Sequence, residues 1–391
     1  MRRAPSIRLS KTFKAFFDSE KSSGIFLIAC TLLALAAANS DLSPTFLGFW
    51  HLQLAGLSVE QWVNDALMAV FFLLVGLELE RELYTGELSN IRNALLPIVA
   101  AFGGICVPAL IHYGLNGGTP TQTGMGIPMA TDIAFALGVL ALLGSRIPAS
   151  LKVFLTALAV MDDLGAIIVI AVFYTEQFSL AYLLGALAVF VGLLTLNRLR
   201  VMAIWPYLLG GVAMWILMHK SGVHATISGV LLAFAIPFSA KAEDSHSPSH
   251  RLEHFLQKPV AFVILPIFAL ANTGIVIGGD WQGDLLSANS AGIITGLVLG
   301  KPLGITLLSL LAVSTGLCRL PGDLQWRHIF GAGLLGGIGF TMSIFITNLA
   351  FADNPDVINA SKMAILLASM SAGLLGFSWL SMVTQARSAR A

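Results

Sequence analysis

The chain has 391 residues, of which 56% are hydrophobic and only 11% are charged. A soluble domain carries about 25% charged residues, so this composition excludes an ordinary soluble domain and makes lipid the solvent for most of the chain. The formal net charge of +1 gives no reason to expect nucleic acid or an acidic polymer as a partner. The three cysteines are an odd number and lie far apart, so they predict neither a disulfide framework nor a metal site.

Twelve stretches are apolar over about the 20 residues that a transmembrane helix requires. Lys220, Ser221 and Gly222 favour a tight turn between the seventh and the eighth of them. We therefore expect an all-α polytopic membrane protein in which residues 1–391 form a single transmembrane domain. The predicted helices cover residues 24–40, 62–84, 95–115, 122–143, 150–174, 179–199, 203–219, 222–238, 256–277, 288–316, 327–350 and 358–384.

The basic residues predict the orientation, because Lys and Arg are retained on the cytoplasmic side of short loops. With a cytoplasmic N-terminus, 19 of the 22 basic residues fall on the cytoplasmic side. Only Lys220 and Lys362 fall on the other side, and Lys301 lies inside an apolar run. A missed helix would invert every later loop and destroy this asymmetry. The sequence thus predicts twelve helices with both termini in the cytoplasm.

Two hydrophilic stretches separate predicted helices. Residues 41–61 form an external loop, where the alternation at 50–54 and Gly56 predict a small hairpin. Residues 239–254 form a cytoplasmic stretch that is rich in charged residues and histidines. This second stretch is either a solvated loop or a surface that responds to pH, because histidine titrates near neutrality.

Four charged side chains lie inside predicted helices: Asp132, Asp162, Asp163 and Lys301. A charge at the bilayer centre costs several kcal/mol, so such residues usually pair with one another or line an ion path. A buried ion pair that only fixes helix packing is one interpretation. Three acids and one base do not cancel, however, and an uncompensated acid in lipid needs a cation or a proton.

Two predicted helices carry signals of interruption. Gly126 and Pro128 in the fourth helix interrupt helical hydrogen bonding, which a membrane tolerates where the backbone faces protein or a water-filled cavity. Thr131 and Asp132 would then lie at the break. The glycines between 331 and 339 predict a second break in the eleventh helix, although close helix packing explains them equally well.

Asp162 and Asp163 are adjacent on one helix, so their side chains point about 100° apart. One should meet an ion cavity while the other finds a separate partner, and Lys301 is the intramembrane base available to it. Carboxylate and hydroxyl oxygens suit Na⁺ or Li⁺, and the sequence offers no Cys and His cluster for zinc. Protons and a cation would compete for the same carboxylates. A site that faces one side at a time would then couple cation export to proton entry.

Four motifs surround or follow these charges: ATDIAFA at 130–136, MDDLG at 161–165, SGVHAT at 221–226 and GKPLG at 300–304. They resemble the motifs of the bacterial NhaA-type sodium/proton antiporters, and the resemblance spans nearly the whole chain. It implies two inverted three-helix repeats, at about 95–174 and 288–384, whose broken fourth and eleventh helices cross near the membrane midplane.

The resemblance also implies a function. It predicts an electrogenic antiporter of the bacterial inner membrane, a secondary active transporter rather than an enzyme, that exports Na⁺ or Li⁺ in exchange for protons by alternating access. The implied protein uses no cofactor, is active at neutral to alkaline pH and contributes to pH and sodium homeostasis. The hairpin at about 45–58 is similar to the dimer contact of the family, so we expect a homodimer in membrane lipid.

The resemblance assigns roles to the intramembrane residues. It makes Asp163 the principal ligand of Na⁺, with Asp132 and Thr131 close by. It pairs Asp162 with Lys301, and this pair would open as protons and sodium exchange. Asp132 would also balance the charges at the ends of the broken helices.

The resemblance further places a pH response around a cytoplasmic funnel. Glu78, Arg81 and Glu82 could equally be interface charges at the end of the second helix, and His224 could be a satisfied core histidine. Asp65, near the external end of the second helix, either lines the exit or is merely solvated. The residues implied in the pH response are Glu78, Arg81, Glu82, Glu253, His254 and His224.

Three rival functions fit parts of the sequence. An intramembrane aspartyl protease needs two carboxylates that share a proton, but the chain has no Gly-Xaa-Gly-Asp motif and this function leaves Lys301 unexplained. A channel with the acids as its filter is commonly assembled from several short chains. A sodium-coupled symporter would need a roomier site for its solute, and only the family resemblance argues against it.

Overall fold

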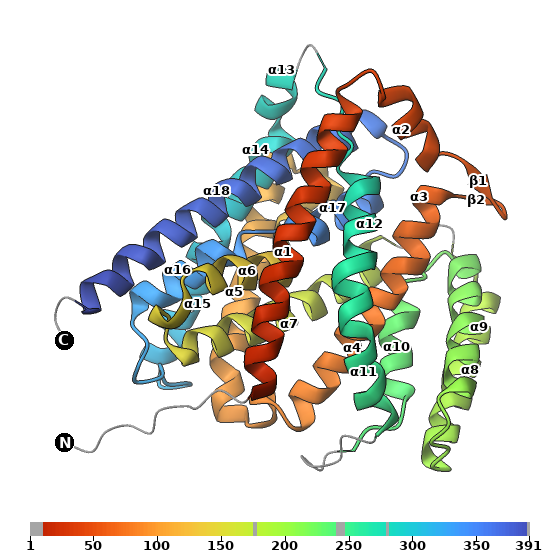
Figure 1. The fold of residues 1–391 in the computed structure, drawn as a ribbon, viewed down its shortest axis with the longest axis horizontal. Helices are drawn as coiled ribbons and strands as arrows, with labels where there is room; N and C mark the ends of the chain where they lie inside the picture. The colour runs from red at the N-terminus through yellow and green to blue at the C-terminus, as the bar shows by residue number, and fades with distance from the viewer. Residues whose placement is uncertain (1–10, 175–177, 240–246, 279–280, 389–391) are drawn as a thin grey trace. The chain divides into compact units, whose positions relative to one another are not determined.

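The structure is a computed structural model that describes residues 11–174, 178–239, 247–278 and 281–388 (Figure 1). Almost all regular structure within these residues is helical, and the one sheet among them is a two-stranded hairpin. Within the same residues, eight helices are long and apolar enough to cross a membrane, or up to ten if each of two bent pairs is one span. The predicted all-α polytopic membrane fold is therefore confirmed.

Helices occupy all twelve predicted stretches, but two of these helices are short. The helix α9 (Trp205–Ser221) has 17 residues and α10 (Ile227–Ala235) has 9. Gly222 ends α9 with a φ of 80°, the left-handed conformation that glycine adopts at little cost, and this makes the predicted tight turn. Pro237 disfavours a helical conformation at the residue before it, so α10 ends at Ala235.

The described chain folds into two compact units. Of the described residues, unit 1 comprises 11–29, 90–166, 275–278 and 281–388, and unit 2 comprises 30–89, 167–174, 178–239 and 247–274. The helices α1 (Lys11–Ala38) and α7 (Ala149–Phe173) contribute to both units. The other helices of unit 1 are α5 (Ile91–Asn116), a 3₁₀ helix (Gln122–Met129), α6 (Ile133–Leu142), a 3₁₀ turn (Gly144–Arg146), α13 (Trp281–Leu286), α14 (Ala288–Thr295), a π-helical segment (Gly296–Gly300), α15 (Lys301–Ser314), α16 (Trp326–Gly336), α17 (Phe340–Ala350) and α18 (Pro355–Ser388).

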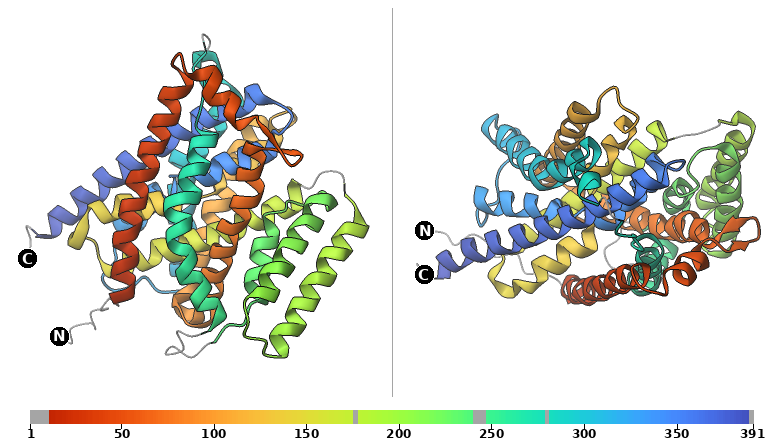
Figure 2. Two further views of the ribbon diagram at one scale, coloured as in Figure 1. Left: turned by 45° about the vertical axis from the view of Figure 1, so that its right-hand side comes forward. Right: turned by 90° about the horizontal axis from the view of Figure 1, so that it is seen from above.

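Unit 2 contains the hairpin and a group of helices in which α8 and α9 lie side by side (Figure 2). Large apolar side chains on the outer surface of α8, including Leu184, Leu187 and Val191, are exposed, as expected for a helix that faces lipid. The elements of unit 2 are α2 (Ser43–Trp50), β1 (Gln53–Leu54), β2 (Leu57–Ser58), α3 (Val59–Gln61), a π-helical segment (Trp62–Leu67), α4 (Met68–Tyr84), a 3₁₀ turn (Glu87–Ser89), α8 (Leu180–Arg198), α9, α10, α11 (Pro248–Pro259), a second π-helical segment (Val260–Ile264) and α12 (Leu265–Asn272).

Glycines let two helices of unit 1 approach closely. A β-carbon at Gly103 of α5 would overlap the carbonyl group of Gly304 in α15, and one at Gly304 would overlap the carbonyl group of Gly103. Small residues at such a contact let membrane helices pack backbone to backbone. This contact fixes α15 beside α5 and so positions Lys301 at the beginning of α15.

Both predicted helix breaks are present in unit 1. Pro128 lies in the 3₁₀ helix, residues 130–132 have no helical structure, and the chain resumes as α6 at Ile133. The second break separates α16 from α17, which are bent by 48°. The two breaks contact each other, because the Asp132 amide donates to the Ile338 carbonyl at 2.7 Å and the Ser343 hydroxyl donates to the Ile127 carbonyl at 2.7 Å.

Two predicted loop regions differ in detail from the structure. The hairpin is shorter than the predicted 45–58, because Ser43–Trp50 is helical, with Pro44 in its first turn. The strands pair Gln53 with Ser58 and Leu54 with Leu57. The predicted stretch 239–254 is not all loop, since α11 already begins at Pro248, where the Ser247 side chain accepts from the amide of His250. The charge run at 241–246 lies outside the described residues.

The π-helical segments are a feature that no local pattern in the sequence predicted. Two of them end just before a proline at the second position of the next helix, Pro266 in α12 and Pro302 in α15. Proline has no amide proton and its ring clashes with the carbonyl four residues earlier, so the preceding turn widens. One such wide turn, Gly296–Gly300, directly precedes Lys301.

Candidate ion-binding site

The break in the fourth helix brings Thr131 to a buried ion pair. Lys301 Nζ donates to Asp162 Oδ2 at 2.5 Å and also donates to Thr131 Oγ1. The Thr131 hydroxyl has two possible acceptors, Asp162 Oδ2 at 2.6 Å and the Gly336 carbonyl at 2.8 Å. All three side chains are 0% exposed. The cluster therefore joins both helix breaks to α7 and α15.

Asp132 lies between the beginnings of two helices. Its Oδ1 accepts from the Phe135 amide of α6 at 3.0 Å. Its Oδ2 accepts from the Thr341 amide of α17 at 3.1 Å and from the Thr341 hydroxyl at 2.5 Å. Free amides make a helix N-terminus electropositive, so one carboxylate offsets the partial charges of both helices.

Asp163 and Asp132 are each 2% exposed, and both belong to unit 1. Asp163 follows Asp162 on α7, so its side chain leaves the helix in a direction about 100° from the ion pair. Among the described residues, no three His, Cys, Asp or Glu side chains gather as a metal-ligand group. A cation in this region would thus be held by one or two carboxylates together with hydroxyl and carbonyl oxygens, which are hard ligands.

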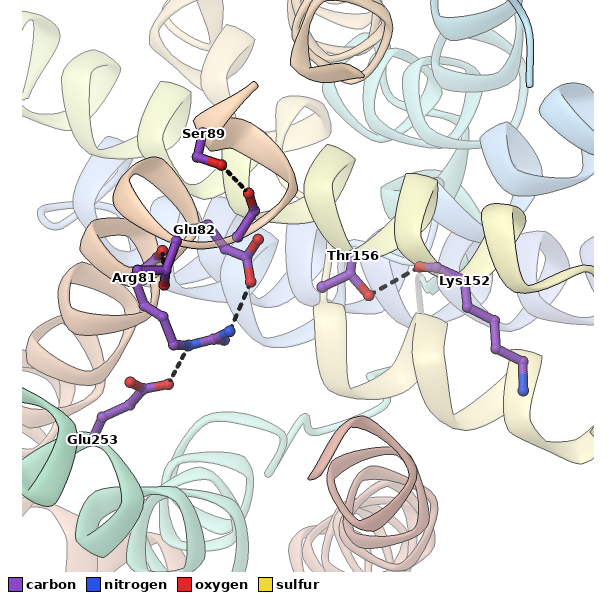
Figure 3. A network of polar contacts seen from close by, with 8 residues as sticks. Arg81, Glu82, Ser89, Lys152, Thr156 and Glu253 are labelled. Carbon is purple, nitrogen blue, oxygen red and sulfur yellow. Dashed lines mark hydrogen bonds and ion pairs between the residues drawn. The ribbon is translucent and has the colours of Figure 1, made fainter. Parts of the chain in front are cut away.

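A second charged cluster lies in unit 2 and links α4 to α11. Arg81 Nε donates to Glu253 Oε1 at 2.8 Å, and Arg81 Nη1 donates to Glu82 Oε1 at 2.9 Å (Figure 3). Glu80 is also buried and accepts from the Ser249 hydroxyl at 3.3 Å. The structure thus brings together Arg81, Glu82 and Glu253, three of the residues implied in the pH response.

The remaining predicted residues lie apart from this ion-pair cluster or at its edge. Glu78 is on α4 one turn before Glu82, and His254 is exposed on α11 beside Glu253. His224 precedes α10 and hydrogen-bonds to the backbone of Tyr174. Asp65 is in the π-helical segment before α4, where its Oδ2 lies 3.7 Å from His219 Nδ1 and its carbonyl accepts from Trp215 Nε1.

The comparison with protein families decides which class of protein this geometry belongs to. A family model described as Na⁺/H⁺ antiporter 1 matches residues 14–380. The chain belongs to this antiporter family. Membership makes it a membrane transporter rather than an enzyme, and the predicted resemblance is confirmed.

Curated relatives of this antiporter family match nearly the full chain. The chain is 76% identical to the Na(+)/H(+) antiporter NhaA of Dechloromonas aromatica, over 97% of each chain. It is 60% identical to Na(+)/H(+) antiporter NhaA 1 of Flavobacterium johnsoniae, over 96% of this chain and 97% of that one. It is 45% identical to the Na(+)/H(+) antiporter NhaA of Helicobacter pylori, over 94% of each.

Sequence reasoning missed three polar residues that the antiporter fold places at these sites. Thr341 and Ser343 follow the glycines of the second break, and both tie one broken helix to the other. Glu80 lies among the charged residues at the end of α4, and its side chain is buried. A polar residue directly after a glycine-rich break is a signal that could have identified Thr341, because such a residue lies at a new helix N-terminus.

Proposed function

We propose that the protein is a secondary active transporter that exports Na⁺ or Li⁺ in exchange for protons across the bacterial inner membrane, and that it needs no cofactor. The observation that carries this proposal is the charge balance of the buried cluster. Asp132, Asp162 and Asp163 are buried with Lys301, whose ammonium group contacts Asp162. When all four are ionised, these side chains carry a formal charge of −2, which a monovalent cation or protons can offset.

Competition for these carboxylates would couple the binding of Na⁺ to the release of protons. A proton on Asp163 or Asp132 removes the charge that would hold Na⁺, and bound Na⁺ opposes protonation of the same oxygens. We assign Asp163 as the principal ligand, with Asp132 and Thr131 beside it. Movement of Thr131, which contacts both Lys301 and Asp162, would couple cation binding to the ion pair.

The two contacting helix breaks support alternating access. Each break frees backbone amides and carbonyls from helical hydrogen bonds, and in a membrane such groups require protein or water partners. A cavity that opens to one side at a time is compatible with this region. Exchange of more protons than sodium ions would be electrogenic, and the membrane potential would contribute about 2.3 kcal/mol per net charge per 100 mV. The broken helices fall within the proposed inverted repeats at about 95–174 and 288–384.

The cluster around Arg81 supports a response to cytoplasmic pH. Both chain termini would be cytoplasmic by the distribution of basic residues, which puts the Arg81 end of α4 on the cytoplasmic side. There a change in the net charge of the Arg81 cluster would change the contact between α4 and α11, with Glu78, His254 and His224 as further members of the response. Asp65, at the other end of the second span, would line the external exit.

The hairpin of β1 and β2 is proposed as the contact of a homodimer within the lipid bilayer. It presents unpaired strand edges and exposed apolar side chains, including Leu52 and Leu54. Deletion of residues 53–58 should convert a dimer to a monomer in light scattering of the detergent-solubilised protein. A dimer that persists after the deletion would contradict this contact.

Transport in proteoliposomes tests the function. A pH-sensitive dye reports the collapse of an imposed proton gradient when Na⁺, Li⁺ or K⁺ is added outside. Na⁺ and Li⁺ should collapse the gradient in the wild type, K⁺ should not, and Asp163→Asn should abolish the response. Sodium flux without proton movement would favour a channel or a symporter, and normal exchange by Asp163→Asn would remove that residue as the shared site.

A further inference from the structure

Unit 1 contains a second buried polar network that the proposed exchange site does not use. Its centre is His112 on α5, which is 0% exposed. His112 Nε2 lies 3.1 Å from Asn289 Oδ1 of α14, and Asn289 Nδ2 donates to Ser361 Oγ of α18 at 2.7 Å. A histidine in apolar surroundings is costly to bury unless its ring nitrogens find partners. This network therefore needs a structural or functional explanation.

The hydrogen bonds of the network fix the proton on the imidazole ring. The Ser361 hydroxyl donates to the Val357 carbonyl at 2.7 Å, so Ser361 Oγ can only accept from Asn289. The amide group of Asn289 then turns its oxygen towards His112, and Nε2 of the ring must be the donor. Nδ1 of the neutral ring is consequently an unprotonated base. It is buried and has no hydrogen-bond partner among the described residues.

His112 lies at the junction where one end of the first broken helix meets one end of the second. A β-carbon added at Gly124, in the 3₁₀ helix of the first broken helix, would contact His112, Asn289 and Phe351. Phe351 directly follows α17 of the second broken helix. His112 is also eight residues after Gly104, which borders Asp162 Oδ1, so it lies about 12 Å along α5 from the ion pair. The proposed topology puts this end of unit 1 on the external side.

A second asparagine strengthens the same junction. Asn116 Nδ2 donates to the carbonyls of His112 and Ala288, each at 3.0 Å. Its Oδ1 accepts from the hydroxyl of Thr121, the residue before the 3₁₀ helix, at 2.8 Å. These bonds join α5, α14 and the start of the first broken helix through neutral groups.

Few ionisable groups lie on the elements around His112. The 3₁₀ helix Gln122–Met129 and α14 contain no ionisable residue. The end of α18 at this junction carries Asp356, which is exposed, and Lys362, which is buried directly after Ser361. Asp353, in the turn before α18, is also exposed, and on α5 the neighbouring Tyr113 is exposed. A proton on Nδ1 would thus add a positive charge to a buried site whose adjacent carboxylates are in solvent.

We propose that His112 is an external proton-accepting residue that controls the opening of the external side of unit 1, a role that rests on the proposed exchange function. In the packed arrangement, a proton on Nδ1 has no acceptor in the part of the chain that the structure describes. A protonated ring is stable only in a conformation in which Nδ1 reaches water, which requires the external ends of the two broken helices to separate. External protons thereby favour the conformation that admits protons to the buried carboxylates.

His112→Gln tests the proposal, because glutamine can still donate to Asn289 but cannot take up a proton. Exchange is measured in oriented proteoliposomes at a fixed internal pH while the external pH is lowered from about 8 to about 6, the range in which histidine titrates. His51→Gln is the matched control, since His51 is exposed and lies outside the network. Between these two pH values, the rate of the wild type and of His51→Gln should rise about threefold more than that of His112→Gln.

Hydrogen exchange of the protein in nanodiscs tests the opening without transport. After correction for the intrinsic effect of pH, amides in residues 122–129 of the wild type should exchange faster at about pH 6 than at about pH 8, and those of His112→Gln should not. Equal external pH dependence of His112→Gln and the wild type, or pH-independent exchange of 122–129 in the wild type, overturns the proposal while the antiporter function stands. A wild type that exchanges no Na⁺ for protons instead removes the proposed function and this inference with it.

Discussion

Asp132 accepts hydrogen bonds from the amides of Phe135 and Thr341, which lie in the first turns of α6 and α17 in the two broken helices. A single carboxylate thus joins two electropositive helix ends that come from opposite halves of unit 1. The pairing explains how two interrupted helices can meet in a membrane without leaving their free amides unsatisfied. It also ties a proposed cation ligand to the conformation of both breaks.

Substitution of this carboxylate should weaken both the fold and cation binding. Asp132→Asn removes the negative charge between the helix ends and leaves an amide group that must donate where the carboxylate accepted. We expect a loss of about 1.5–3 kcal/mol in stability, the range for hydrogen bonds to a charged group, and weaker Na⁺ binding. Thr341→Val is the control, because it removes one hydroxyl donor and keeps the backbone amide. Thr341→Val should therefore lose less stability than Asp132→Asn. Thermal unfolding of both variants in detergent measures the two losses, and equal losses would contradict this prediction.

The ion pair of Asp162 and Lys301 should be coupled in a double-mutant cycle. Both side chains are 0% exposed, so removal of one leaves a buried group without its counter-charge. Lys301→Met alone should destabilise the protein by about 3–5 kcal/mol, and the combined Asp162→Asn and Lys301→Met variant should recover part of that loss. Additive losses in thermal unfolding would show that the two side chains are not coupled.

The contact of Gly103 with Gly304 makes a packing prediction. Gly304→Ala should destabilise unit 1 by about 1–3 kcal/mol, because the added methyl group meets the backbone of α5. Gly114→Ala is the matched control, since Gly114 is on α5 and has nothing within 4 Å of an added β-carbon. The control should be neutral or stabilising, as alanine is the better helix former. Similar unfolding temperatures for the two variants would argue against the close approach.

Arg81 should set the pH at which transport is activated. Without its guanidinium group, the contact between α4 and α11 loses two ion pairs and one positive charge, so the local potential becomes more negative. The pH profile of exchange for Arg81→Gln should therefore move to higher pH, by about one unit, with a smaller effect on the maximal rate. Arg198→Gln, at the exposed end of α8, provides a control that should keep the wild-type profile. An unchanged profile for Arg81→Gln would leave Arg81 as a purely structural residue.

The helices and the first helix break could be predicted from the sequence, because their signals are local or follow from the thickness of the bilayer. Long apolar stretches predicted the helices, and Gly126 with Pro128 predicted the first break, because both signals lie within the segment itself. The adjacent Asp162 and Asp163 predicted that one carboxylate would need Lys301. The family resemblance supplied the individual roles of Asp163, Asp132 and Thr131, which no spacing argument provides.

Features that depend on contacts between distant segments were not predictable from local patterns. Thr341 bonds to Asp132 across 209 residues of chain, and His112 bonds to Asn289 across 177. Neither pair has a periodicity or a motif that marks it. The early start of α11 was missed because its first turn is polar, although Ser247 followed by Pro248 is a sound signal for a helix N-terminus. Two of the π-helical segments depend on prolines in the helices that follow them, Pro266 and Pro302.

In the proposed mechanism, Na⁺ and protons compete for the same buried carboxylates. Equilibrium binding of radioactive Na⁺ to the purified protein tests this competition most directly. If Na⁺ displaces one proton, the Na⁺ affinity of the wild type should fall about tenfold for each unit by which the pH is lowered. Addition of Na⁺ should also release protons into a weakly buffered solution. Asp163→Asn should show neither effect. Sodium binding whose affinity is independent of pH, or binding to the wild type without proton release, would contradict the shared site.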